Sequence, residues 1–381
     1  MNVSCLQEHL QRGLGQVQRA VASKSSLPVL SNVLVTTDEG RLRLSATNME
    51  IGITTWIDAA IEEEGRTTVD ARLLGEFVNT LPPGQVRLSM QPAKPILAIK
   101  SGRDSANING IDADDFPEIA SLDDEGATFS AELDAQQLRE AIALVELAAA
   151  ADDSRPVLAG MLMRFDGDRL MMAAADGFRM AVRTVALTAA VEETRATIVP
   201  ARALREVARI IGDQTEPVRL AITPARSQLV FRVGQTEVLS RLIDGTFPDV
   251  MQIVPREFET SVEVGREPFS NAVRRAGYFA RDNNDVVRLT IHPGDDDLEP
   301  GTIEVSANAA ERGTSQSFVD ASITGKRAEI AFNARYLADV LGVLRQGQVF
   351  LGMNGSNQAG VVKVVGDDHY DHVIMPMVIG S

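Results

Sequence analysis

The stretch "VPARALREVARII" at 199–211 has two copies elsewhere in the same chain, "VDARLLGEFVNTL" at 69–81 and "FNARYLADVLGVL" at 332–344. Each copy contains Ala-Arg-x-Leu, and the apolar residues after it recur at the spacing of a helix with one buried stripe. Asp70 and Asn333 stand where a helix N-cap is favoured, and Pro200 suits a first helical turn. The motif therefore predicts three amphipathic helices in a chain built from repeats.

Other markers keep the same register as this motif. A strand-like stretch follows each copy, an amphipathic stretch precedes it, and an aromatic or methionine residue followed by proline closes each unit. These markers are "GQVRLSM", "EPVRLAI" and "GQVFLGM" from 84, 216 and 347, the helical stretches from 10, 138 and 269, and the pairs at 116–117, 247–248 and 375–376. Period-two apolar runs separated by turn residues lie between them. We predict an α+β fold of three tandem domains, each with two helices and antiparallel sheets.

Polar or proline-containing links near residues 125 and 257 give the domain boundaries. The predicted domains are 1–125, 126–256 and 257–381. Accidental similarity among helices of similar composition is the alternative, and it requires helix, strand and proline markers to share one register by chance.

Composition narrows the class of protein. The chain has 381 residues with 44% hydrophobic content, one cysteine and four histidines, which leaves no intramolecular disulfide and little material for a metal site. It contains no apolar run of membrane-spanning length and no secretion signal, so we expect a cytoplasmic protein.

The net charge of −16 argues against nucleic-acid binding unless the charge is segregated. Six helical windows sum to +6, so the rest of the chain carries −22. A purely structural explanation is also open: Arg favours helices and Asp favours turns, and these preferences alone would make the helices more positive than the rest of the chain. With the repeat, the split predicts units that form an arc, closed by a second copy, with basic helices facing phosphates without reading bases.

Five segments, in this order and spacing, carry a family resemblance: "LPVLSNVLV", "GIDADDFPEI", "AADGFRMAV", "IDGTFPDV" and "VIMPM". Over essentially the whole chain they resemble the bacterial DNA polymerase III beta subunit, the sliding clamp family. The resemblance implies a homodimeric ring of six similar domains that encircles duplex DNA without sequence specificity. It also implies a non-catalytic processivity factor without a cofactor, whose partners are the polymerase catalytic subunit, the clamp loader and repair proteins.

The resemblance further implies a pocket for short linear peptides from these partners. Its residues here are Leu158, Ala175, Gly177, Phe178, Arg179, Met180, Pro248, Ile253, Val373, Ile374, Met375, Pro376 and Met377. Flexible methionines suit the capture of different apolar anchors. Phe178 replaces a polar aromatic residue and Gln252 a basic residue of many relatives, which favours a more apolar peptide. Alternatively, "VIMPM" is only a last edge strand whose proline blunts the edge.

For DNA, the resemblance points to Lys24, Arg72 and Arg202, and more weakly to Arg155. For Arg72 and Arg202, packing or interface pairing is an equally good interpretation. At the joint between two copies it implies an interface that contains Arg103 and Ile108 from the first domain and Tyr278 and Phe279 from the third. Ala106 stands where some relatives have a larger aromatic residue, so we expect an interface that is weaker or packed differently.

Two other classes of protein compete with this interpretation. "DDHYDH" at 367–372 is readable as a metal site through His369 and His372, although a solvated turn is the simpler interpretation. No phosphate-loop, nucleophile-elbow or zinc-protease signature occurs. We therefore expect no enzyme and no catalytic, cofactor-binding or metal-binding residue. The third class is a β-rich scaffold that binds proteins and never contacts DNA.

Overall fold

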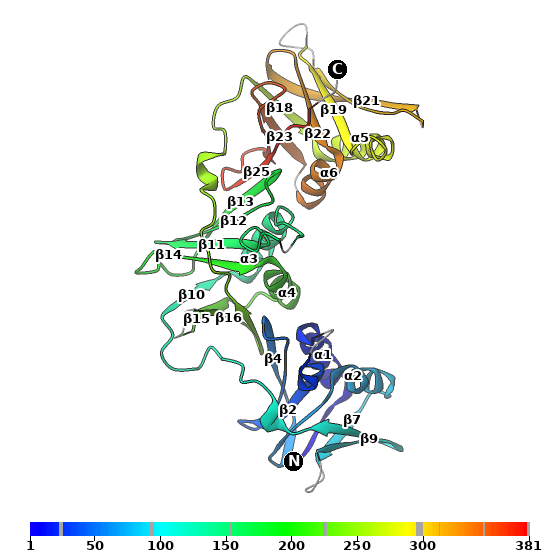
Figure 1. Ribbon diagram of the computed structural model, residues 1–381, viewed down its shortest axis with the longest axis vertical. Coiled ribbons are helices and arrows are strands. Elements are labelled where there is room, and N and C mark those ends of the chain that lie inside the picture. Colours follow the sequence, from blue (N-terminus) through cyan, green and yellow to red (C-terminus); the bar gives the residue numbers. More distant parts are fainter. Residues whose placement is uncertain are drawn as a thin grey trace. The chain divides into compact units, whose positions relative to one another are not determined.

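The computed structural model describes residues 1–22, 26–90, 95–152, 154–223, 227–294, 300–311, 313–345 and 347–378. Its α-helices (Figure 1) are α1 (Gln7–Val17), α2 (Ala71–Thr80), α3 (Ala135–Glu146), α4 (Ala201–Ile211), α5 (Arg266–Ala280) and α6 (Ala334–Val343). Short 3-10 helices are η1 (Gln18–Ala20), η2 (Pro28–Ser31), η3 (Ala113–Asp115) and η4 (Val250–Gln252). The predicted α+β fold is confirmed, because two long antiparallel sheets carry these helices.

The first compact unit contains residues 1–139, 187–191 and 202–242. Its sheet has, in spatial order, β10 (Phe129–Leu133), β15 (Val218–Ile222), β16 (Gln228–Val233), β17 (Thr236–Arg241), β4 (Ile51–Ile57), β3 (Arg41–Thr47), β2 (Asn32–Asp38), β6 (Arg66–Asp70), β9 (Asp104–Ile111), β8 (Ile96–Ser101), β7 (Gln85–Met90), β1 (Asn2–Leu6) and β5 (Ala60–Glu63). The pairing of β17 with β4 joins strands of the first and second repeats into one sheet.

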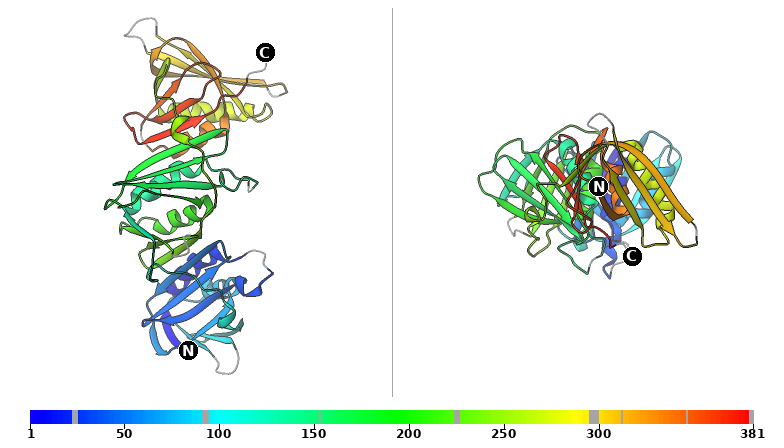
Figure 2. Two further views of the ribbon diagram at one scale, coloured as in Figure 1. Left: turned by 60° about the vertical axis from the view of Figure 1, so that its left-hand side comes forward. Right: turned by 90° about the horizontal axis from the view of Figure 1, so that it is seen from above.

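The second compact unit contains residues 140–186, 192–201 and 243–381. Its sheet has, in spatial order, β14 (Arg195–Pro200), β11 (Gly160–Asp166), β12 (Arg169–Ala175), β13 (Arg179–Ala186), β25 (Tyr370–Ile374), β24 (Gly360–Val364), β23 (Gln348–Met353), β18 (Thr260–Gly265), β21 (Gly313–Gly325), β20 (Gly301–Ala309), β19 (Val286–His292) and β22 (Ala328–Asn333). Figure 2 shows α5, in yellow, against one face of the orange strands. Here β13 and β25 join the second and third repeats.

The repeated motif forms the helices α2, α4 and α6, as predicted. Asp70 caps α2 by accepting a hydrogen bond from the backbone N–H of Leu73 at 2.7 Å, and Asn333 caps α6 in the same way through the N–H groups of Arg335 and Tyr336. The apolar stripes are buried: Leu74 and Val78 in α2, Leu204, Val207 and Ile211 in α4, and Leu337, Val340 and Leu341 in α6. Burial of one face fixes each helix on its sheet.

The compact units differ from the three repeats, because each unit combines one repeat with part of the second one. Continuous strand pairing explains this grouping: hydrogen bonds of β17 to β4 and of β13 to β25 cross from one repeat to the next. The boundaries at 125 and 257 stay a prediction. No helix within the described ranges has the length and apolar character needed to cross a bilayer.

The two joints between repeats are built to one plan. At the first, Asn48 accepts hydrogen bonds from the N–H groups two and three residues further on; at the second, Asp176 does the same. The next residue has a positive φ in both turns, 74° at Met49 and 95° at Gly177. The repeat therefore extends from the elements to the turns that connect them, and it provides an internal reference for each site.

A candidate peptide-binding site

The turn after β12 forms one wall of the candidate site. The Asp176 carboxylate accepts hydrogen bonds from the backbone N–H groups of Phe178 at 2.8 Å and Arg179 at 2.9 Å. This closed turn directs Phe178 outward, with 60% of its surface exposed. The carbonyl of Phe178 accepts from the N–H of Met375 at 2.8 Å, so the tail after β25 is fixed directly beside the turn.

A buried apolar cluster supports this wall. The cluster consists of Ala173, Met180, Val182, Ile198, Phe247, Val250, Val254, Val361 and Val373. Four large apolar side chains that lie close to these residues in the chain are exposed: Phe178 at 60%, Met251 at 45%, Ile253 at 51% and Met375 at 45%. We call these four residues the apolar patch. Large exposed apolar side chains on segments that share one buried cluster are candidates for a protein-binding surface.

The side chain of Arg179 connects the turn to α6. Its Nη1 donates to the Asp339 carboxylate at 2.6 Å and its Nε to Asp176 at 3.1 Å, and its guanidinium lies 4.3 Å from the centre of the Tyr336 ring. Only 12% of the side chain is exposed. Arg155 donates to the carbonyl of Asp176 at 3.1 Å. Both arginines therefore hold the turn in place.

The tail residues predicted for the pocket lie on different faces. Val373 belongs to the buried cluster, whereas Ile374 is fully buried one position further along the strand, on the opposite face. Met375 is exposed, and the N–H of Met377 donates to the carbonyl of Ala331 at 2.8 Å. The structure thus places Met180 and Val373 in one apolar cluster and Ala175 against it. Ile253 and Met375 are exposed on the segments that contribute Val254 and Val373 to the cluster.

The remaining predicted residues occupy the surroundings of this cluster. Leu158 is half-buried, and its N–H donates to the carbonyl of Arg155 at 2.9 Å. Pro248 is exposed and Pro376 is half-buried. The prediction missed Met251 and Val361, although Met251 lies between the predicted Pro248 and Ile253 and is signalled by its own apolar character. It also missed Tyr336 and Asp339, whose role depends on a contact that the sequence does not show.

The residues predicted to contact DNA have different surroundings. Arg72 is exposed and donates to Glu76 at 2.8 Å within α2; the hydrogen bond and charge of Glu76 raise the pKa of Arg72. Arg202 is exposed on α4, with no ion pair among the residues that the structure describes. Arg155 is engaged with the Asp176 turn, and Lys24 lies outside the described residues.

The residues predicted for the interface between two copies are also spread over several surroundings. Arg103 is exposed, Ile108 is 4% exposed, and Phe279 is half-buried. Tyr278 is 56% exposed and carries Arg281 5.6 Å from its ring centre. Leu73 on α2 and Phe318 on β21 are further exposed apolar residues that the sequence did not single out, because the solvent-facing side of each element follows only from its packing.

The two histidines considered for a metal site differ in burial. His372 is fully buried, whereas His369 is exposed at the turn before β25. Burial lowers the pKa of His372 to about 3 and keeps the ring neutral. Tyr370 donates from its hydroxyl to the carbonyl of Leu144 at 3.1 Å, and burial raises the pKa of this hydroxyl well above its usual range. Within the described ranges, no group of three or more potential ligands is arranged for a metal.

Fold and site together define a repeat-built α+β chain of the sliding-clamp class. Family models of the DNA polymerase III beta subunit match its N-terminal domain at residues 1–120, its central domain at 132–249 and its C-terminal domain at 251–378. The chain belongs to the DNA polymerase III beta subunit family. It is a DNA sliding clamp, a non-catalytic processivity factor of replication.

The similarity to individual relatives spans whole chains. The beta sliding clamp of Synechococcus elongatus is 33% identical over 385 residues, which cover 100% of both chains. A crystal structure of the Bacillus subtilis DNA polymerase sliding clamp superposes with a TM-score of 0.92 at 25% identity, with 100% of each chain covered. A Pseudomonas aeruginosa sliding clamp bound to griselimycin gives 0.90 at 28% identity, again over 100% of each chain.

Proposed function

We propose that the apolar patch receives a short linear peptide from proteins that work on the clamp, among them the polymerase catalytic subunit, the clamp loader and repair proteins. The observation that carries this proposal is the exposure of Phe178, Met251, Ile253 and Met375 on segments joined to one buried cluster. The exposed methionines adapt to anchors of different shape. The surrounding apolar residues favour peptides whose anchors are Leu or Phe.

The internal repeat supports a single site of this kind in each chain. At the first joint, Glu50 stands in the turn position of Phe178, and Arg241 in the tail position of Met375: its N–H donates to the carbonyl of Glu50 at 2.8 Å. Charged groups thus replace two exposed apolar groups on the same backbone plan. An apolar peptide gains little by burying such groups.

Fluorescence anisotropy with a labelled peptide carrying paired Leu and Phe anchors tests the proposal. We expect Ile253→Glu to weaken binding at least about tenfold, because burying its carboxylate against an apolar anchor is costly. Met49→Glu is the matched control: Met49 is 54% exposed at the equivalent turn of the first joint. Equal loss in both variants, or no loss in Ile253→Glu, excludes the patch as the peptide site.

We also propose that two copies form a closed ring around duplex DNA. On one side β9 pairs with β8, and on its other side no described strand pairs with residues 104–109. In the same way β21 pairs with β20 on one side, and on its other side no described strand pairs with residues 313–320. Pairing these edges between copies satisfies both sets of backbone groups.

Sedimentation of the purified chain must then give a stable dimer. The dimer, once loaded on circular DNA, is expected to resist high salt and to dissociate when the circle is cut; a scaffold that never encircles DNA shows no such difference.

A further inference from the structure

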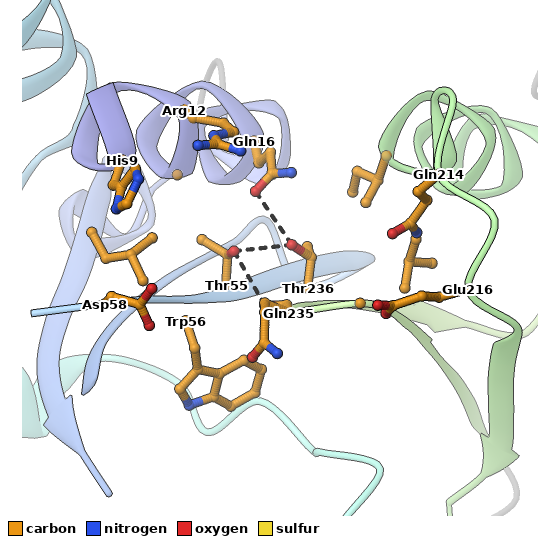
Figure 3. Close-up of a pocket in the computed structure, with 15 residues that line it drawn as sticks. His9, Arg12, Gln16, Thr55, Trp56, Asp58, Gln214, Glu216, Gln235 and Thr236 are labelled. Carbon is orange, nitrogen blue, oxygen red and sulfur yellow. Dashed lines mark hydrogen bonds between the residues drawn. The ribbon is translucent and has the colours of Figure 1, made fainter. Parts of the chain in front are cut away.

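A second candidate site is a cleft of about 560 Å³ in the first unit, on the helix side of the strand pair β4–β17 (Figure 3). Figure 3 shows His9, Arg12 and Gln16 projecting from α1, and Gln214 and Glu216 on the segment that follows α4. Binding sites for small molecules commonly have volumes of about 300–1,000 Å³. The cleft is therefore large enough for a ligand of several rings.

The internal repeat explains why this space is open. Tyr370 opens β25 in the second unit just as Thr236 opens β17 in the first. The Tyr370 ring is 1% exposed, and its hydroxyl donates to the backbone of Leu144 in α3. Thr236 reaches the equivalent helical residue, Gln16, only through a hydroxyl-to-amide contact of 3.3 Å. Because Thr lacks the aromatic ring, the first unit has room for a planar ring from a ligand.

The polar groups around the cleft define the chemistry of such a ligand. Arg12 has no ion pair within the described part of the chain, so it is available for an anionic group. The Nε2 of Gln214 is buried and lacks a hydrogen-bond partner among the described residues. A side-chain amide matches the donor and acceptor edge of a nucleobase. Gln16 offers a second amide near the same space.

Two carboxylates limit the range of ligands. Asp58 and Glu216 also line the cleft and would repel a bare anion such as inorganic phosphate. Carboxylates in nucleotide sites instead accept hydrogen bonds from sugar hydroxyls. The cleft thus combines space for an aromatic ring, amides for its edge, carboxylates for hydroxyls and a cation for a phosphate.

We propose that this cleft binds a nucleoside monophosphate unit, with the base in the space beside Thr236 and the phosphate near Arg12. The occupant is either a free nucleotide or an unstacked nucleotide of a single strand, since both present the same groups. This activity goes beyond the clamp function and does not depend on the apolar patch.

Equilibrium dialysis with the four nucleoside 5′-monophosphates and with a single-stranded deoxyadenosine hexamer tests the proposal. Trp56, the only tryptophan of the chain, follows Thr55 in β4, and its fluorescence gives a second readout of the same titrations. We expect saturable binding of a monophosphate or of the hexamer. The ligand that binds more tightly shows whether the cleft takes a free nucleotide or a nucleotide of a single strand. Inorganic phosphate is expected to bind at least about tenfold more weakly.

Two variants locate the binding. Thr236→Tyr places in the cleft the residue that the second unit carries at this position, and it must abolish binding while circular dichroism stays that of the wild type. Arg12→Gln is expected to weaken monophosphate binding about tenfold, whereas Arg327→Gln, the same change at an exposed position between β21 and β22, has no effect. Peptide binding at the apolar patch must persist in all three variants, so the two proposals fail separately.

Three results overturn the proposal: no saturable binding of any nucleotide or of the hexamer, equal binding of inorganic phosphate, or wild-type binding by Thr236→Tyr. If Thr236→Tyr proves misfolded, Arg12→Gln with wild-type nucleotide affinity is the result that excludes the site.

Discussion

Arg179 and Asp339 form an ion pair of 2.6 Å between β13 and α6, and the guanidinium stacks on Tyr336 at 4.3 Å. Arg179 immediately follows Phe178, the most exposed residue of the apolar patch. The pair therefore fixes the strand that carries the apolar patch to a helix that is contributed by another repeat. Its residues lie about 160 positions apart in the chain, so only the folded structure brings them together.

The first prediction concerns this pair. Arg179→Ala is expected to lower the free energy of unfolding by about 1–3 kcal/mol, because the Asp176 and Asp339 carboxylates lose a charge-assisted partner. It should also weaken peptide binding, because the 176–178 turn loses its anchor. Asp339→Asn removes one pair and should have a smaller effect on both quantities. Urea unfolding and peptide anisotropy measure them, and wild-type peptide affinity in Arg179→Ala contradicts the positioning role.

Deletion of residues 375–381 provides the second prediction. The truncated chain loses Met375 from the apolar patch and the hydrogen bond from its N–H to Phe178, while β25 stays intact. We expect peptide binding to disappear and the dimer to persist in sedimentation. Simultaneous loss of peptide binding and of the dimer indicates that this segment is a structural strand rather than a wall of the site.

The third prediction concerns the link after the first repeat. Hydrogen bonds from Arg232, at 2.8 and 2.6 Å, hold the pKa of Asp123 below its usual value. Because the folded-state pKa is depressed, the pair stabilises the fold above an unfolded-state pKa of about 3.9, and this stabilisation is lost as the pH falls through the folded-state pKa. Asp123 is 71% exposed, so the effect is below about 1 kcal/mol. Asp123→Asn should be less stable than wild type at pH 7, and the difference should vanish at the lowest pH.

The fourth prediction uses His372. Its pKa is about 3 in the folded chain, against about 6.5 when unfolded, so the unfolded state alone binds the proton between these values. Stability contributed by the neutral ring is present above pH 6.5 and decreases as the pH falls toward 3. His372→Val introduces the residue that the first unit carries at this strand position, Val238. Urea unfolding measures the free energy of unfolding at pH 7 and at pH 5. Between these pH values it should decrease less in the variant than in the wild type. An equal decrease in both proteins assigns the effect to another group.

A feature of this structure can be predicted from the sequence when residues close together in the chain determine it, and cannot when it depends on contacts between distant residues. Helix positions and caps follow from local patterns, so α2, α4 and α6 are predicted to within a few residues. The buried apolar cluster is predicted in part, because Met180 and Val373 come from segments that the repeat aligns. The pairing of Arg179 with Asp339 is not predictable, because it depends on how α6 packs against β13. The cleft beside Thr236 becomes visible only when the strand pairing aligns this residue with Tyr370.

The last prediction separates two arginines that the repeat makes equivalent in sequence. Arg202 has no ion pair within the described residues, whereas Arg72 already bonds to Glu76. A phosphate must compete with that carboxylate for Arg72 but not for Arg202. If both helices face DNA, Arg202→Ala should weaken duplex binding more than Arg72→Ala does. In a plot of log K for duplex binding against log salt concentration, Arg202→Ala should also reduce the steepness of the slope by about 0.9. Titrations of a fluorescent duplex between low and moderate salt measure both slopes. Unchanged slopes in both variants remove these arginines from the DNA-binding surface and assign them to packing or to an interface.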